Sequence, residues 1–80
     1  MITIINYEMG NLFSVESSFN YLGYKTDITD SNEKIVNSKI IIMPGVGSFK
    51  KAMKIIKSKK IDLSINESLR KGSKILGICL

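Results

Sequence analysis

The sequence predicts one α/β domain built on an open, doubly wound parallel sheet. Short β-branched runs alternate along the chain with stretches in which apolar residues recur at steps of three and four. No Asn-Gly hairpin signal separates the predicted strands, so we expect parallel pairing and right-handed crossovers. The most apolar run, Ile40–Met43, is typical of a strand that is covered on both faces of its sheet.

The first third of the chain predicts two strands joined by a helix. Met1–Ile5 is a β-branched first strand, and Asn6–Gly10 forms a loop. A helix is expected from Asn11, a suitable N-cap, to Gly23, a suitable C-terminal glycine. Its apolar stripe, which we assign to the core, consists of Leu12, Val15, Phe19 and Leu22. Tyr24–Ile28 is expected to be a second, more exposed strand.

The middle of the chain predicts a short helical turn and then a central strand. The helical turn is expected at Glu33–Val36, after a polar stretch. The central strand is expected at Lys39–Met43. Pro44–Phe49 is expected to break that strand sharply.

The last third predicts helical structure followed by a final strand. The apolar face of the first segment consists of Phe49, Ala52, Met53 and Ile56. Ile61, Ile65 and Leu69 indicate either a second helix or a bent continuation, which Gly72 ends. Ile75–Ile78 is expected to be a buried, central strand.

Length and composition limit what the chain can be. Eighty residues form at most one domain, and such a domain buries only about 60 to 65% of its unfolded surface. We therefore expect residues 1–80 to be the amino-terminal part of a larger domain. One cysteine cannot form an internal disulfide, and neither a signal peptide nor a long apolar run is present, which together favour a cytoplasmic, non-membrane protein. We expect no metal and no cofactor.

The charge of the chain is basic, with a formal net charge of +5. Six lysines cluster locally: Lys50, Lys51, Lys54, Lys57, Lys59 and Lys60. A nucleic-acid site would have arginines and aromatic residues interleaved with them, and neither occurs there. A solvated helix face is favoured over a polyanion site, and we expect no nucleic-acid partner.

Cys79 follows the last predicted strand directly. Open α/β sheets place their ligands at the carboxyl ends of their strands, where this side chain would lie. Gly77 and Cys79 have the spacing of the first half of a nucleophile elbow, in which a Cβ at Gly77 is expected to collide with neighbouring elements. A thiolate at the start of a following helix would have a lowered pKa. Cys79 is the predicted nucleophile.

The loop after the third predicted strand should approach Cys79, because both lie at the same edge of a parallel sheet. The predicted oxyanion-hole and substrate-binding residues are Gly45, Val46, Gly47 and Leu80, whose backbone N–H groups could stabilise an oxyanion. Taken singly, a cysteine after a strand is more often a buried apolar residue, and a Pro-Gly-x-Gly loop is more often a simple turn. Their combination favours acyl-transfer chemistry.

Several motifs resemble a known family. They are Pro44-Gly-Val-Gly-Ser-Phe49, Ala52-Met53, Leu76-Gly-Ile-Cys-Leu80, Tyr7, Met9-Gly10-Asn11-Leu12 and Ser14-Val15. Together they resemble the class I (triad) glutamine amidotransferases, and among these most closely the glutaminase subunits of imidazole glycerol phosphate synthase. The resemblance extends over all 80 residues but covers less than half of such a domain.

The resemblance implies a flavodoxin-like, three-layer fold and glutamine hydrolysis through a thioester on Cys79. It also implies that ammonia passes to a (β/α)₈-barrel synthase (cyclase) subunit of a heterodimer in histidine biosynthesis. The implied partner-facing loop contains Tyr7, Met9, Gly10 and Asn11. The family's triad His and Glu lie far downstream, and this sequence contains no histidine. We therefore expect the 80 residues to be inactive alone.

Other interpretations remain open. The family commonly has Asp, Gly and Pro at the positions of Asn6, Glu8 and Lys74, and the first two departures concern partner identity. The first alternative is a paralogous amidotransferase subunit of surface-sugar biosynthesis (O-antigen or nonulosonic acid). The second is a non-catalytic flavodoxin-like binding module. A dinucleotide-binding module is disfavoured, because only Gly10 of a G-x-G-x-x-G motif follows the first strand.

Overall fold

A computed structural model of the chain describes residues 1–7, 12–45 and 49–78. Its elements are β1 (Ile2–Ile5), α1 (Leu12–Tyr21), β2 (Thr26–Thr29), α2 (Asn32–Val36), β3 (Ile40–Pro44), α3 (Phe49–Ser58), α4 (Ile61–Arg70) and β4 (Lys74–Ile78). Each strand and helix that the sequence predicts has a counterpart here, which confirms the α/β assignment.

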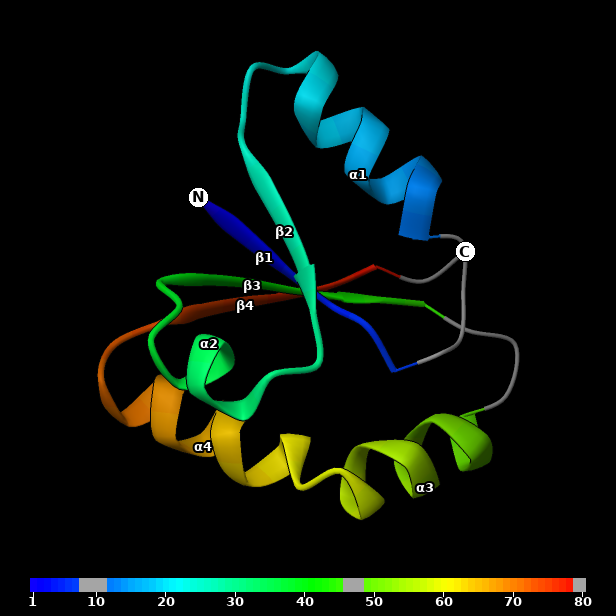
Figure 1. Ribbon diagram of the computed structural model, residues 1–80, viewed down its shortest axis with the longest axis vertical. Helices are drawn as coiled ribbons and strands as arrows, with labels where there is room; N and C mark the ends of the chain where they lie inside the picture. The colour runs from blue at the N-terminus through cyan, green and yellow to red at the C-terminus, as the bar shows by residue number, and fades with distance from the viewer. Residues whose placement is uncertain (8–11, 46–48, 79–80) are drawn as a thin grey trace.

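The four strands form one parallel sheet in the order β2-β1-β3-β4. Helix α1 lies on one side of the sheet, and α2, α3 and α4 lie on the other, as Figure 1 shows. The chain therefore has the three layers of a doubly wound, flavodoxin-like fold, as the sequence predicts. Within the described ranges, no helix is both long and apolar enough to cross a bilayer.

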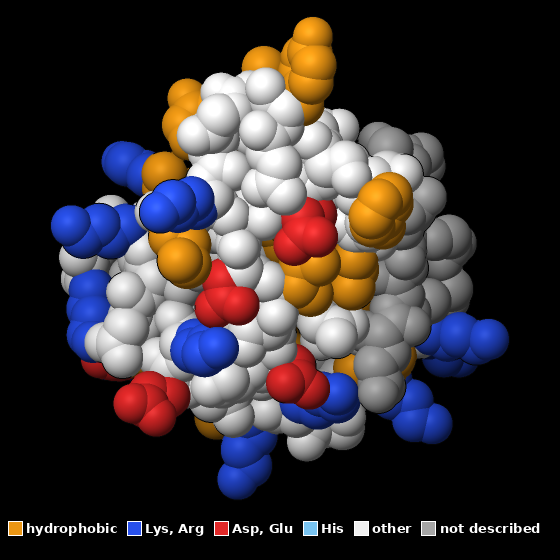
Figure 2. Space-filling view, turned by 45° about the horizontal axis from the view of Figure 1, so that its top comes forward, with side chains coloured by type: hydrophobic (Ala, Val, Ile, Leu, Met, Phe, Trp, Pro, Cys, Tyr) orange, Lys and Arg blue, Asp and Glu red, His pale blue; other side chains and the backbone are white. Residues whose placement is uncertain are grey.

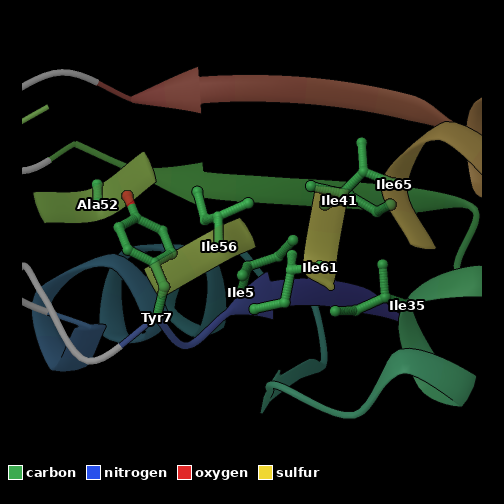
Figure 3. Close-up of a cluster of buried hydrophobic side chains, with 8 residues drawn as sticks. All are labelled: Ile5, Tyr7, Ile35, Ile41, Ala52, Ile56, Ile61 and Ile65. Carbon is green, nitrogen blue, oxygen red and sulfur yellow. The ribbon is translucent and has the colours of Figure 1, made fainter. Parts of the chain in front are cut away.

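The core is divided by the sheet into two apolar clusters. Side chains alternate along β1, so Ile4 faces α1 and Ile5 faces the other helices. The cluster under α1 consists of Ile2, Ile4, Val15 and Ile42, with Leu12, Phe19 and Ile28 packed against it. The cluster on the other side consists of Ile5, Tyr7, Ile35, Ile41, Ala52, Ile56, Ile61 and Ile65 (Figure 3).

Helix α1 ends earlier than its apolar stripe predicts. Gly23 has a φ of +93°, and its N–H donates to the Asn20 carbonyl at 3.0 Å. The N–H of Tyr24 donates to the Phe19 carbonyl at 3.0 Å, which completes the C-terminal turn that Gly23 was predicted to make. Leu22 therefore lies outside the helix and is 67% exposed, so its assignment to the core was wrong.

The helical region of the last third consists of two helices, which settles the alternative left open by the sequence. Lys60 has a φ of +58°, a left-handed conformation that ends the helical path between α3 and α4. Ile61 and Ile65 of α4 are buried as predicted, but Leu69 is 45% exposed. Gly72 ends α4 with a φ of +95°, and the N–H of Ser73 donates to the Ser68 carbonyl at 3.1 Å.

Strand β4 differs from its prediction as a central, buried strand. Among the described residues it pairs only with β3 and forms an edge of the sheet. Leu76, in the middle of β4, is 53% exposed. An apolar run such as Ile75–Ile78 has the same appearance in either position, because what covers a strand depends on distant segments.

Candidate active site

The carboxyl ends of β3 and β4 lie side by side. Met43 is the register partner of Gly77, and Pro44 is the register partner of Ile78. Gly45 directly follows Pro44, so it lies at the same edge of the sheet as the end of β4. The two predicted site loops therefore begin at the same edge of the sheet, as expected for parallel strands, and they begin from strands that pair directly.

Pro44 belongs to β3 rather than breaking it, which extends the predicted strand by one residue. Proline lacks an N–H donor but keeps its carbonyl, so it is tolerated at the end of a strand. Its side chain is almost fully buried. Burial and a fixed φ hold the start of the glycine loop in one position.

The structure does not show the crowding that the sequence analysis predicted around Gly77. A Cβ built on Gly77 would meet no heavy atom within 4 Å, and the expected collision with neighbouring elements is therefore wrong for this chain. Gly77 is also exposed. The space into which a Cβ of Gly77 would point, on one face of the sheet, is therefore open.

Tyr7, a predicted partner-facing residue, has its side chain in the core. It is 3% exposed and belongs to the cluster on the α3 side, where Figure 3 shows its ring beside Ala52. Burial raises the pKa of the Tyr7 hydroxyl, because the phenolate would be poorly solvated there. The sequence held a signal for this position, since Tyr7 lies two residues after Ile5 and so on the same face of the extended chain.

Several predicted site residues lie outside the described residues: Met9, Gly10, Asn11, Val46, Gly47, Cys79 and Leu80. Their roles stay predictions. Among the residues that are described, no three His, Cys, Asp or Glu side chains come together as metal ligands would.

No protein-family model matches the chain. Curated proteins that are similar to it include several named imidazole glycerol phosphate synthase subunit HisH. The chain is 40% identical over its 80 residues to the protein from Carboxydothermus hydrogenoformans. It is 44% identical over the same length to those from a Geobacillus species and from Bacillus mycoides.

The alignment covers the whole length of this chain but less than half of the length of each relative. All of the chain is matched, yet it spans 40% of the Carboxydothermus protein and 38% of the other two. The family resemblance of the motifs and the parallel α/β fold agree with this match. All 80 residues of this chain are therefore homologous to the HisH subunit of imidazole glycerol phosphate synthase.

Proposed function

We propose that this chain is the nucleophile-bearing part of a glutaminase subunit of imidazole glycerol phosphate synthase. The observation that carries the proposal is the identity of 40 to 44% over the whole chain to proteins of that name. The adjacency of Pro44 and Ile78 supports it, because these residues precede the two predicted site loops.

The proposed chemistry is hydrolysis of the glutamine side-chain amide. The Cys79 thiolate attacks the amide carbon, and the C–N bond then breaks as ammonia leaves with an added proton. Water attacks the resulting thioester, the C–S bond breaks, and glutamate and the free thiol are released. Backbone N–H groups of Gly45, Val46, Gly47 and Leu80 are the proposed donors to the oxyanion.

The chemistry needs an imidazole base, which these 80 residues do not contain. A base must take the thiol proton and later protonate the departing nitrogen, a role that typically contributes about 10²- to 10⁴-fold in rate. The sequence has no histidine. We therefore propose that the 80 residues do not turn over glutamine by themselves.

The proposed setting is the cytoplasm and the histidine pathway. The released ammonia would pass to a (β/α)₈-barrel synthase (cyclase) subunit in a heterodimer. The shared name of the curated relatives favours this role over the surface-sugar alternative.

The test measures ammonia release and thiol labelling on the same protein. We expect no sustained glutaminase activity from the 80-residue chain, and we expect a glutamine-like chloroketone to label Cys79 faster in the folded chain than in urea. Cys79→Ala is the control for both measurements, since Cys79 is the only cysteine. Equal labelling of folded and unfolded protein would remove the nucleophile assignment, and sustained activity of the chain alone would remove the requirement for a downstream base.

A further inference from the structure

Helix α3 presents a stripe of lysines to solvent. Lys50, Lys54 and Lys57 are all exposed and are spaced four and three residues apart. At 3.6 residues per turn, this spacing puts the three within about 60° of one another around the helix axis. Ala52 and Ile56, on the opposite side of the helix, are 5% and 3% exposed and belong to the core. Lys50, Lys54 and Lys57, here called the lysine stripe, therefore face away from the core.

The lysine stripe has no acidic partner among the described residues. The ion pairs that the structure describes join other side chains: Lys34 with Asp27, Lys59 with Asp30, and Arg70 with Glu67. Helix α3 itself contains no acidic residue. Its lysines repel one another at spacings of three and four residues, and Lys50 lies in the first turn, where the helix dipole disfavours a cation. The stripe therefore lowers the stability of the helix that carries it.

The structure changes the weight of the lysine cluster that the sequence shows. The sequence alone favoured a solvated helix face, on which charges of both signs commonly pair along the helix. Helix α3 already buries its apolar side, so its outer side needs no further apolar cover. Residues that oppose local stability without a packing role are typical of functional surfaces. The stripe is thus a positive surface suited to an anion.

The composition of the stripe indicates the kind of anion. Arginine is preferred where carboxylates are recognised by two parallel hydrogen bonds, whereas lysine binds phosphate as a point charge. Helix α3 has four lysines and no arginine. No aromatic residue stands between Lys50 and Lys57 on which a nucleic-acid base could stack. A membrane surface would need the apolar side of the helix to be exposed, and that side is buried.

We infer that the lysine stripe binds a linear polyphosphate anion, a chain of phosphates without bases. The stripe extends over seven residues of helix, a length of about 10 Å at 1.5 Å per residue, along which several consecutive phosphates can lie. This inference is independent of the proposed function, because no predicted active-site residue belongs to the stripe.

The first experiment measures binding of inorganic polyphosphate, labelled at one end with a fluorophore, by fluorescence anisotropy. Three phosphate contacts predict a slope of about −2 in log K against log salt, as each contact on a single strand contributes about −0.7. Affinity should therefore fall roughly 15-fold between about 50 mM and about 200 mM salt. Absence of binding at the lower salt concentration, or binding that salt does not weaken, would overturn the inference.

The second experiment removes the stripe without changing the fold. Replacing all three lysines of the stripe with glutamine should lower the affinity for polyphosphate at least about tenfold and bring the salt slope close to zero. Circular dichroism and urea unfolding should show a folded variant, because the substitutions remove repulsion. If the triple variant unfolds, Lys54→Gln alone should still reduce the slope by about 0.7.

The matched control changes the net charge by the same amount at the other end of the sheet. Lys25 and Lys39 directly precede β2 and β3, and Lys74 begins β4. Replacing these three with glutamine also removes three of the five net positive charges. Affinity should stay within about threefold of wild type, because salt screens distant charges. Equal losses in the two triple variants would mean that only net charge matters, which would overturn the inference.

Three other polyanions distinguish the remaining occupants. We expect oligothymidylate, polyglutamate and phosphatidylserine vesicles each to bind more weakly than polyphosphate of equal charge. Tighter binding of oligothymidylate would make the stripe a nucleic-acid surface, tighter binding of polyglutamate would make it a surface for an acidic protein, and tighter binding of the vesicles would make it a membrane surface. Each of these results would overturn the inference.

Discussion

Tyr7 connects the carboxyl edge of the sheet to the core. It follows β1 by two residues, and its ring packs between that strand and α3 (Figure 3). An apolar environment disfavours the phenolate, which is why burial raises the pKa of this hydroxyl above its ordinary value. Core packing therefore fixes the chain at Tyr7, two residues beyond the end of β1.

This raised pKa makes the free energy of unfolding depend on alkaline pH. The unfolded chain releases the Tyr7 proton near its ordinary pKa of about 10, whereas the folded chain retains it to higher pH. Stability from this group is therefore complete below about pH 10 and is lost as pH rises through the folded pKa. The free energy of unfolding in urea can be measured for wild type and Tyr7→Phe at roughly pH 9 and pH 11, on either side of the ordinary pKa. It should fall less between these pH values in the variant than in wild type. An identical loss in both proteins would contradict the assignment, and Tyr21→Phe, at an exposed position, is the control.

Gly72 and Gly77 show what the sequence could predict about single residues. Gly72 was predicted to end a helix, and its positive φ confirms this, because a helix end followed by glycine is a local pattern. The predicted collision at Gly77 was wrong, because steric surroundings are supplied by residues far away in the sequence. The burial of Tyr7 was not predicted, because the first strand was expected to end at Ile5 and Tyr7 was therefore assigned to a loop.

The start of α2 is tied to the junction between α3 and α4. The Asn32 amide donates from Nδ2 to the Lys59 carbonyl at 3.2 Å, and its Oδ1 accepts from Ser64 Oγ at 2.8 Å. Lys59 also forms an ion pair with Asp30 at 3.0 Å, which lowers the pKa of that carboxyl. One short segment therefore positions both long helices of this face.

Asn32→Ala should lower the free energy of unfolding by about 1 to 2 kcal/mol, because it removes two hydrogen bonds and leaves the buried Ser64 hydroxyl without its acceptor. Chemical denaturation at neutral pH measures the change. The control is Asn66→Ala at an exposed position of α4, which should change stability by less than about 0.5 kcal/mol. Equal effects of the two substitutions would mean that the link between α2 and α4 contributes little.

At the scale of elements, local patterns predicted helices and strands well. Helices α1 and α3 were found from apolar steps of three and four, and β1 from its β-branched run. The position of β4 at the edge was not predicted, since a central and an edge strand can share one sequence pattern. The candidate site was predicted as far as the shared edge at which β3 and β4 end, which follows from parallel topology, whereas the direct pairing of the two strands is a finding of the structure.

The whole molecule has an uneven distribution of charge. Lysine and arginine side chains project along the left, lower and lower-right parts of the outline in Figure 2. Helix α3 has four lysines and no acidic residue in its sequence Phe-Lys-Lys-Ala-Met-Lys-Ile-Ile-Lys-Ser. Lys50 and Lys54 lie four residues apart, a spacing at which like charges cost about 0.2 to 0.5 kcal/mol.

Added salt should therefore stabilise the chain. Raising NaCl from about 10 mM to about 150 mM shortens the screening length from about 30 Å to about 8 Å and weakens the repulsion among the lysines. The free energy of unfolding should rise over this range, and Lys54→Gln should reduce the rise. Lys34→Gln is the control. Lys34 forms an ion pair with Asp27 at 3.5 Å, so this substitution should destabilise the chain most at low salt and should increase the rise of the free energy of unfolding with salt. Stability that is independent of salt in all three proteins would contradict this account.

The interior place of β1 has a consequence for synthesis on the ribosome. β1 is translated before β2 and β3, its neighbours in the sheet, and Ile2 pairs with both Thr26 and Ile40. At roughly 5 to 20 residues per second, the β3 partner of Ile2 emerges roughly two to eight seconds later. Through that interval one edge of this apolar strand has no partner, so we expect translation speed and chaperone access to affect the yield of folded protein.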